Sequence, residues 1–206
     1  MSPGRLITIE GLDGAGKTTL SVALHDALSG YLTDVRLLRE PGGVEVAERV
    51  RDLVKDPELL IGTRAETLLY AAARAQLVEQ AIEPLLQSGA WVLLDRFVDS
   101  SLAYQGAGRA LGIHAVRVIN EFATQGLHPD RTLLLNVDPA LGRVRSHTRP
   151  GPLDRLELEQ EEFFGRIAAA YTELATEEPD RIRTIDAAQE PAAVLEAALA
   201  ALADLL

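Results

Sequence analysis

A glycine-rich segment follows the first apolar run of the chain and constrains its fold more than any other feature. Residues 11–18 read GLDGAGKT, which completes the pattern GxxxxGK[ST], and the run RLITIE precedes them at 5–10. Glycines allow a tight turn in which successive backbone N–H groups converge on a phosphate, and the following helix adds the positive end of its dipole. The sequence therefore predicts a strand, a phosphate-binding loop and a helix, in that order.

Each part of this loop has a predicted role, weighed against a glycine-rich turn that binds nothing. Lys17 is expected to reach the β- and γ-phosphate oxygens of a nucleotide, and Thr18 to ligate Mg²⁺. The context of strand, loop and helix favours the phosphate-binding interpretation. The predicted nucleotide-binding set is Gly11, Leu12, Asp13, Gly14, Ala15, Gly16, Lys17 and Thr18.

Short apolar runs alternate with helical segments along the rest of the chain. Five runs are expected to be strands, and they lie at 6–9, 35–38, 91–94, 132–137 and 182–185. Continuous apolar strands separated by helices are typical of a parallel sheet that is covered on both faces. We expect an α/β fold with a five-stranded parallel sheet and a ligand site at the carboxyl ends of its strands.

Composition excludes several classes of function. A chain of 206 residues that is 47% hydrophobic is sufficient for one core, so residues 1–206 are expected to form a single domain. Cysteine is absent and the four histidines lack ligand spacing, so any metal is expected to be held by oxygens. The net charge of −11 argues against binding to nucleic acid. No apolar leader and no run of ~18 apolar residues occurs, which predicts a cytoplasmic protein without a membrane segment.

Two segments depart from the simple alternation of strands and helices. The longest helical pattern runs from Thr63 to Gln87, and Pro84 is expected to kink or end it. Residues 150–152 read PGP between flanking arginines, which predicts a mobile loop between two helices, a short lid over about 143–155. Where arginines gather, the expected ligand is a small anion.

The third predicted strand ends in an acid and a guanidinium. Residues 91–96 read WVLLDR, so Asp95 and Arg96 are expected at the tip of this strand, next to the bound phosphates. Asp95 can order Mg²⁺ or its waters, and Arg96 can bridge donor and acceptor phosphates as a phosphoryl group passes between them. The alternative is an ordinary ion pair that caps the next segment.

A longer pattern surrounds Arg96. LLDRF at 93–97, SS at 100–101 and AYQ at 103–105 match the recognition pattern of the thymidylate kinase family, which this sequence resembles. REPGG at 39–43 matches the phosphate-side loop of the bacterial members, and YAAAR at 70–74 matches the helix that holds thymine. LDR at 153–155 and TIDA at 184–187 complete a resemblance that runs from residue 5 to the terminal helix.

The resemblance implies an acceptor site for thymidine monophosphate (dTMP). Tyr70 offers a plane on which thymine can stack, and Arg74, one helical turn on, can donate to its O4. By itself, an aromatic residue at this spacing is more often part of the core. Tyr104 is implied to crowd the position of a ribose 2′-hydroxyl. The implied acceptor set is Asp13, Arg39, Tyr70, Arg74, Arg96, Ser100, Ser101, Tyr104 and Gln105.

The sequence leaves two possible roles open for some of the candidate residues. Ser100 can contact the base edge or cap a helix. Asp13 is repelled by donor phosphates, so the resemblance implies that it points to the 3′-hydroxyl of the acceptor. Arg39 is implied to bind the acceptor phosphate. Glu10 and Glu40 can orient water or an arginine, or can be purely structural.

The lid arginines are implied to take part in catalysis. In one branch of the family an arginine follows the acid of the phosphate loop, but that position is Gly14 here. The chain therefore resembles the branch whose lid supplies the arginine, from among Arg143, Arg145 and Arg149. The implied catalytic set is Lys17, Arg96, Asp13, Arg149 and Arg145.

The expected reaction is transfer of the γ-phosphoryl group of ATP to dTMP, with Mg²⁺, in a P-loop kinase fold. A phosphate monoester is mostly dianionic at neutral pH, so this acceptor needs no general base. The family resemblance further implies a homodimer, for which the helix at 63–87 offers a surface.

Other functions remain open. A deoxynucleoside kinase has a neutral hydroxyl as acceptor and needs Asp95 or a nearby acid as general base. A kinase for another pyrimidine monophosphate would use the same residues. A nucleotide-dependent switch would share the phosphate loop, but the guanine-reading pattern Asn-Lys-x-Asp is absent.

Overall fold

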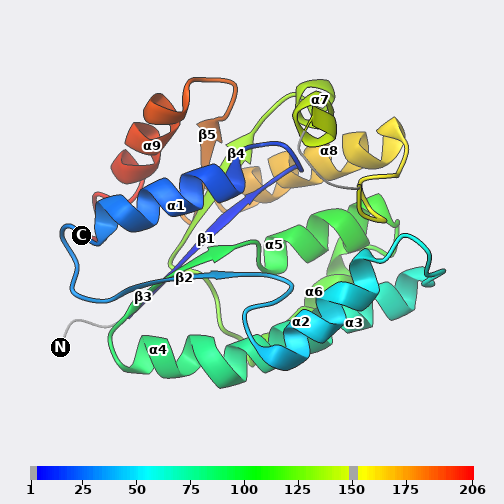
Figure 1. Ribbon diagram of the computed structural model, residues 1–206, viewed down its shortest axis with the longest axis horizontal. Helices are drawn as coiled ribbons and strands as arrows, with labels where there is room; N and C mark the ends of the chain where they lie inside the picture. Colours follow the sequence, from blue (N-terminus) through cyan, green and yellow to red (C-terminus); the bar gives the residue numbers. More distant parts are fainter. Residues whose placement is uncertain (1–3, 149–152) are drawn as a thin grey trace.

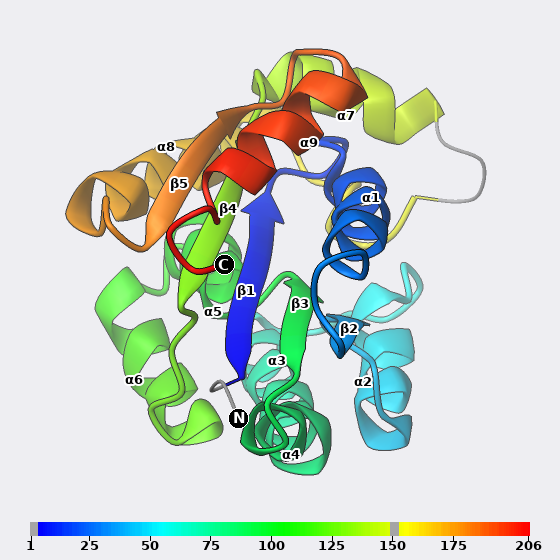
Figure 2. The ribbon, with the colours of Figure 1, turned by 90° about the vertical axis from the view of Figure 1, so that its left-hand side faces the viewer.

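Five parallel strands form one sheet, as the apolar runs predict (Figure 1, Figure 2). The computed structural model describes residues 4–148 and 153–206. The strands lie in the order β2-β3-β1-β4-β5, so that the first strand is central. Their bounds are β1 Arg5–Gly11, β2 Val35–Arg39, β3 Trp91–Asp95, β4 Arg131–Asn136 and β5 Ile182–Asp186. The predicted α/β class and the parallel sheet are confirmed.

Helices cover both faces of the sheet (Figure 1). One face carries α1 (Lys17–Leu28) and α9 (Pro191–Ala200), and the other carries the helices from α3 to α6. In residues 4–148 and 153–206, no helix combines the length and the apolar character needed to cross a bilayer. The remaining bounds are α2 Glu45–Lys55, α3 Thr63–Leu77, α4 Glu83–Gln87, α5 Val98–Ser101, α6 Ile113–Thr124, α7 Pro139–Thr148 and α8 Glu161–Glu177.

The central strand sends alternate side chains to the two faces of the sheet, as a strand must. Ile7 and Ile9 pack in the same apolar cluster as Leu24 of α1. Leu6 belongs to a second cluster, with Phe97, on the opposite face. Strand β1 pairs with β3, and Ile9 lies opposite Asp95 in this pairing. The phosphate loop and the end of β3 are therefore neighbours.

The predicted helix from Thr63 to Gln87 is continuous, but it contains a π-helical turn, η1, at Val78–Ile82. Pro84 does not end the helix, which continues to Gln87. Proline lacks the N–H that an α-helix needs at this point, and the wider turn directly before it accommodates the missing hydrogen bond. A second π-helical segment, η2 at Leu102–Gly108, continues α5.

The lid is more helical than its sequence predicts. Since α7 extends to Thr148, Arg143 and Arg145 are helical residues and not part of a loop. This helix packs against the phosphate loop at Gly142, where a Cβ would lie only 2.9 Å from Asp13 O. That contact supports the helix along a stretch that a loop was expected to occupy. Arg149 and the segment at 150–152 lie outside the described residues.

Candidate active site

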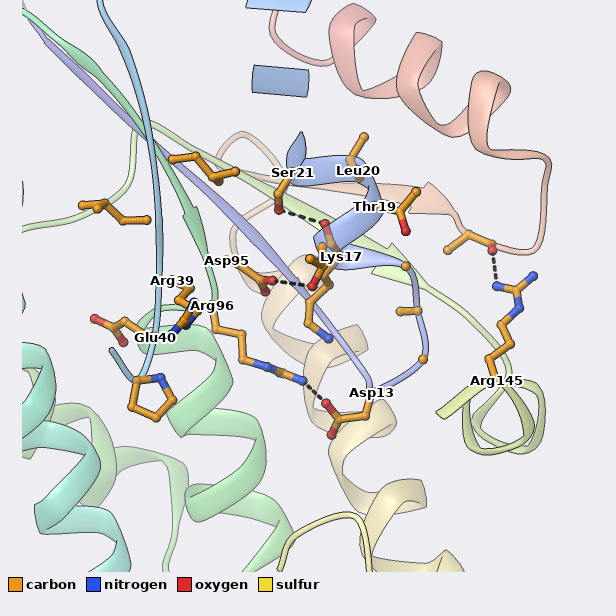
Figure 3. Close-up of a pocket in the computed structure, with 18 of the residues that line it drawn as sticks. Asp13, Lys17, Thr19, Leu20, Ser21, Arg39, Glu40, Asp95, Arg96 and Arg145 are labelled. Atoms are coloured by element: carbon orange, nitrogen blue, oxygen red, sulfur yellow. Dashed lines mark hydrogen bonds and ion pairs between the residues drawn. The ribbon is translucent and has the colours of Figure 1, made fainter. Parts of the chain in front are cut away.

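A large cavity lies over the carboxyl ends of β1, β2 and β3, where a parallel sheet is expected to bind its ligand. Its volume is about 1060 Å³, and Figure 3 shows part of its lining. The phosphate loop, α2, α3 and η2 contribute to the wall, as does the segment between β5 and α9. The strand ends thus bring together residues that are far apart in the sequence.

The phosphate loop leaves β1 at Gly11 and enters α1 at Lys17, as predicted. The buried ammonium of Lys17 donates to the carbonyl oxygens of Gly11 (3.1 Å) and Leu12 (2.7 Å). Burial, together with the nearby positive charge of Arg96, lowers the pKa of Lys17 to about 8. The Lys17 ammonium thus lies inside the loop and is more acidic than an exposed lysine.

Gly14 lies in direct contact with the backbone of α7. Its φ is 77°, and a Cβ at this position would lie 2.0 Å from Gly142 O and 2.8 Å from Gly142 C. No side chain fits between the two backbones. An arginine at position 14 is therefore incompatible with the observed place of α7.

Two oxygen-bearing side chains meet at the entrance to α1. The hydroxyl of Thr18 donates to Asp95 Oδ2 at 3.1 Å. Asp95 is the last residue of β3 and lines the cavity. A hydroxyl and a carboxylate are the ligand types that Mg²⁺ prefers, so the predicted pair fits such an ion.

Arg96 follows β3 and turns its guanidinium toward the phosphate loop (Figure 3). Its backbone is left-handed, with a φ of 72°, which is uncommon for a residue other than glycine. The guanidinium donates to Asp13 Oδ1 at 2.6 Å and to Gly11 O at 3.1 Å, and it lies 4.9 Å from the centre of the Tyr104 ring. These contacts fix the Arg96 guanidinium between the phosphate loop and Tyr104.

Asp13 completes this cluster. Its Oδ2 accepts a hydrogen bond of 2.8 Å from the Tyr104 hydroxyl. Burial raises the pKa of the Asp13 carboxyl, but the charges of Arg96 and Lys17 outweigh this effect, and the pKa lies below its usual range. Asp13 is therefore an anion at neutral pH, turned toward Arg96 and Tyr104.

The opposite wall contains residues that the sequence assigned to the acceptor. Tyr70 and Tyr104 line the cavity, and burial raises the pKa of the Tyr70 hydroxyl, which keeps it neutral. Arg39, the last residue of β2, also lines the cavity and donates to both carboxylate oxygens of Glu48 at 3.0 Å.

Arg74 lies behind this wall, and the structure does not place it in the cavity lining. Only 2% of the residue is exposed. Its guanidinium donates to Glu40 (2.8 Å), Ser101 (2.9 Å) and the carbonyl of Phe97 (2.8 Å), and also contacts Asn120. Its donors are engaged by the protein, so its contact with a base stays a prediction.

The three remaining polar residues assigned to the base edge are also buried. Ser100 accepts a hydrogen bond of 2.9 Å from Arg96, and Ser101 accepts one from Arg74. Gln105 donates to the buried carboxylate of Glu66 at 3.0 Å. All three hold parts of the site together in this structure, and their contacts with a substrate stay predictions.

The structure describes two of the three candidate lid arginines, Arg143 and Arg145. Arg145 lines the cavity and donates to Ala187 O at 2.8 Å (Figure 3). Arg143 faces Glu161 of α8 at 3.8 Å. Of the two described candidates, only Arg145 contributes to the cavity wall.

Three charged residues of α2 were missed by reasoning from the sequence. Glu48, Arg51 and Lys55 line the cavity. Their spacing of three and four residues places them on one helix face, which the sequence could have indicated. Lys55 donates to Asp154 at 2.7 Å, which ties α2 to the last residues of the predicted lid.

The central strand leads through a glycine-rich loop into a helix. Around the adjacent cavity lie Lys17, Thr18, Asp95 and Arg96. This combination defines the class of the protein, a P-loop phosphotransferase. Comparison with known proteins gives the family. Residues 9–198 match the family model described as thymidylate kinase, and the chain belongs to the thymidylate kinase family.

Individual relatives support this assignment. A thymidylate kinase of Oenococcus oeni is 48% identical, over 93% of this chain and 91% of the relative. One from Lactobacillus delbrueckii subsp. bulgaricus is 45% identical, over 95% and 94%. The crystal structure of thymidylate kinase from Ehrlichia chaffeensis has a TM-score of 0.79 at 29% identity, and the match covers 97% of this chain and 99% of that one. The predicted family, the kinase class and the P-loop kinase fold are confirmed, and phosphorylation of dTMP is the activity of this family.

Proposed function

We propose that the protein transfers the γ-phosphoryl group of ATP to the phosphate of dTMP, with Mg²⁺, to give ADP and dTDP. The observation that carries this proposal is the place of Arg96. Its guanidinium lies between the phosphate loop and the acceptor wall, bonded to Asp13 and within 4.9 Å of the Tyr104 ring centre. A cation there can neutralise charge on a group that passes between two phosphates.

The donor half of the site is formed by the phosphate loop and Arg145. The loop amides and Lys17 would hold the phosphates of ATP, since the lysine can exchange its carbonyl partners for phosphate oxygens. The purine would lie near Arg145 and the backbone at Ala187, which line the same end of the cavity.

Thr18 and Asp95 would hold Mg²⁺. Their oxygens lie 3.1 Å apart at the cavity, and a small hard cation that keeps several waters suits a site with few protein ligands. When bound, the ion supplies positive charge to the β- and γ-phosphates.

The acceptor half would hold dTMP between α3, η2 and the end of β2. Tyr70 would stack on thymine, Tyr104 would exclude a ribose 2′-hydroxyl, and Arg39 would bind the phosphate, which competes with Glu48 for the guanidinium. A contact between Arg74 and thymine O4 requires Arg74 to share or exchange one of its present partners. Ser101, Asn120 and the Phe97 carbonyl are the neutral partners, and so easier to exchange than the charged Glu40.

The transfer itself needs positioning and charge neutralisation. A dianionic phosphate oxygen of dTMP attacks the γ-phosphorus, and the bond to the leaving oxygen of ADP breaks. Lys17, Arg96 and an arginine of the lid, Arg145 or Arg149, would stabilise the charge that the transferred group carries. Closure of the lid would exclude water and suppress hydrolysis of ATP.

An assay of ADP release across nucleoside monophosphates and thymidine tests this proposal. We expect dTMP to be the preferred acceptor, and Arg96→Ala to lower kcat by about 100-fold or more while ATP binding changes little. Preference for thymidine over dTMP would favour a deoxynucleoside kinase. Rapid hydrolysis without an acceptor would favour a nucleotide-dependent switch.

A homodimer through the helix at 63–87 and the adjacent α6 is also proposed. Phe122 and Val118, 89% and 51% exposed, lie four residues apart on α6, and Leu68 of α3 is 57% exposed. Phe122→Glu is expected to give monomers in light scattering. The matched control is Tyr31→Glu, since Tyr31 is 78% exposed but follows α1, on the other face of the sheet.

A further inference from the structure

Glu10 is a buried carboxylate beside the phosphate loop, and the transfer described above does not use it. It has no exposed surface, and it precedes Gly11 at the end of β1. Among the described residues of the cavity wall, Glu10 does not appear, so it does not touch a ligand bound there. A buried carboxylate needs hydrogen-bond donors around it, and their identity indicates its role.

The donors to Glu10 come from two other elements. From the start of α5, the backbone N–H groups of Phe97 (2.7 Å) and Ser100 (3.3 Å) donate to Oε1, and the Ser100 hydroxyl donates to Oε2 at 2.5 Å. From α8, the Tyr171 hydroxyl donates to Oε2 at 3.0 Å. Four donors suit an ionised carboxylate, which only accepts.

Two of these contacts control Arg96. The Phe97 N–H belongs to the peptide unit directly after Arg96, whose φ of 72° is unfavourable unless its surroundings enforce it. Ser100 accepts from Arg96 Nη1 at 2.9 Å while it donates to Glu10. The carboxylate thus fixes both the backbone and the guanidinium of Arg96.

The surroundings of Glu10 act on its charge in opposite directions. Burial and the nearby Asp99 raise the pKa of Glu10 to about 7, and the hydrogen bond from Ser100 and the positive charge of Arg96 oppose that rise. Asp99 is itself held by Arg181 at 2.7 and 2.9 Å, which anchors the other side of α5. The short helix behind Arg96 is therefore held from β1 and from the start of β5.

We propose that Glu10 is a positioning residue for phosphoryl transfer, which holds Arg96 between donor and acceptor through Ser100 and the Phe97 amide, with Tyr171 as its support. The proposal rests on the role proposed for Arg96. Glu10 acts through this arginine and makes no contact with either substrate.

The experiment compares Glu10→Gln with wild type in kcat and in the KM for each substrate. Loss of the carboxylate is expected to lower kcat by about 10- to 100-fold, the effect of a small misplacement of a catalytic group, with little change in either KM. Ile7→Val is the control. Ile7 is fully buried on the same strand and packs in the apolar cluster that includes Leu24 of α1, on the other face of the sheet from Glu10, so this variant should retain kcat.

A double-mutant cycle separates positioning from general structural support. In an Arg96→Ala background, Glu10→Gln is expected to cause no further loss of kcat, because there is no guanidinium left to hold. Wild-type kcat in Glu10→Gln, or the same loss in both backgrounds, would overturn the proposal. If Glu10→Gln does not fold, Tyr171→Phe, which removes one donor to Glu10, is measured in both backgrounds against the same two outcomes.

The same data test the proposed function separately. A wild-type protein without activity on dTMP would refute the proposed function. An active wild type together with an unimpaired Arg96→Ala would refute the role of Arg96, and the positioning role with it.

Discussion

Substitution of Gly14 by alanine tests the contact between the phosphate loop and α7. A Cβ at this position would lie 2.0 Å from Gly142 O, and real Cβ atoms do not come closer than 3.0 Å to such an atom. The helix or the loop must therefore move by at least about 1 Å. Both belong to the cavity wall, so the movement is expected to reach the reacting groups.

Two costs contribute to the expected loss of stability. The left-handed φ of 77° costs an alanine about 1–2 kcal/mol. Separation of packed backbones adds about 1–3 kcal/mol. Gly14→Ala should thus lower the free energy of unfolding by about 2–5 kcal/mol. Gly126→Ala is the matched control: Gly126 has a φ of 78° and no atom within 4 Å of its Cβ, so only the first cost applies.

Urea denaturation of both variants, followed by the fluorescence of the single tryptophan, Trp91, measures the difference in stability. The kcat of Gly14→Ala at saturating substrate reports the displacement of α7. Equal destabilisation of the two variants, with wild-type kcat in Gly14→Ala, would refute the reasoning, because it would mean that α7 does not rest on the loop.

Three other outcomes are expected. Affinity for ATP should fall as the pH rises through about 8, because Lys17 then loses its proton; calorimetry that finds constant affinity contradicts this. Asp95→Asn should raise the Mg²⁺ concentration for half-maximal rate by about 10-fold or more, in a titration of rate against Mg²⁺. Arg145→Ala should raise the KM for ATP more than that for dTMP, because Arg145 donates to Ala187 O, near which the purine of ATP is proposed to bind; equal effects in steady-state kinetics would contradict that proposal.

The parts of the site that the sequence predicts are those that depend on the local chain. The phosphate loop is encoded in eight consecutive residues, and the strands are encoded in short apolar runs. Asp95 and Arg96 could be placed because the carboxyl ends of parallel strands meet at one edge. None of these predictions depends on how the helices pack against the sheet.

The direction of individual side chains could not be predicted in the same way. Tyr70 and Arg74 are one turn apart on α3, yet Tyr70 lines the cavity and Arg74 is buried against Glu40. Glu40 lies 34 residues before Arg74 in the chain, and no local sequence pattern predicts this contact. The extent of α7 likewise depends on a contact between Gly142 and the phosphate loop, which only tertiary structure reveals.

The pairing of β1 with β3 has a consequence for how this protein can vary. With Ile9 opposite Asp95, a backbone ladder fixes the offset between the strand that leads into the phosphate loop and the strand that ends at Asp95. One inserted residue in either strand would shift that segment by about 3.3 Å and turn its side chains to the other face. Insertions and deletions among relatives should therefore be confined to the connections outside these two strands, whatever changes the helices accept.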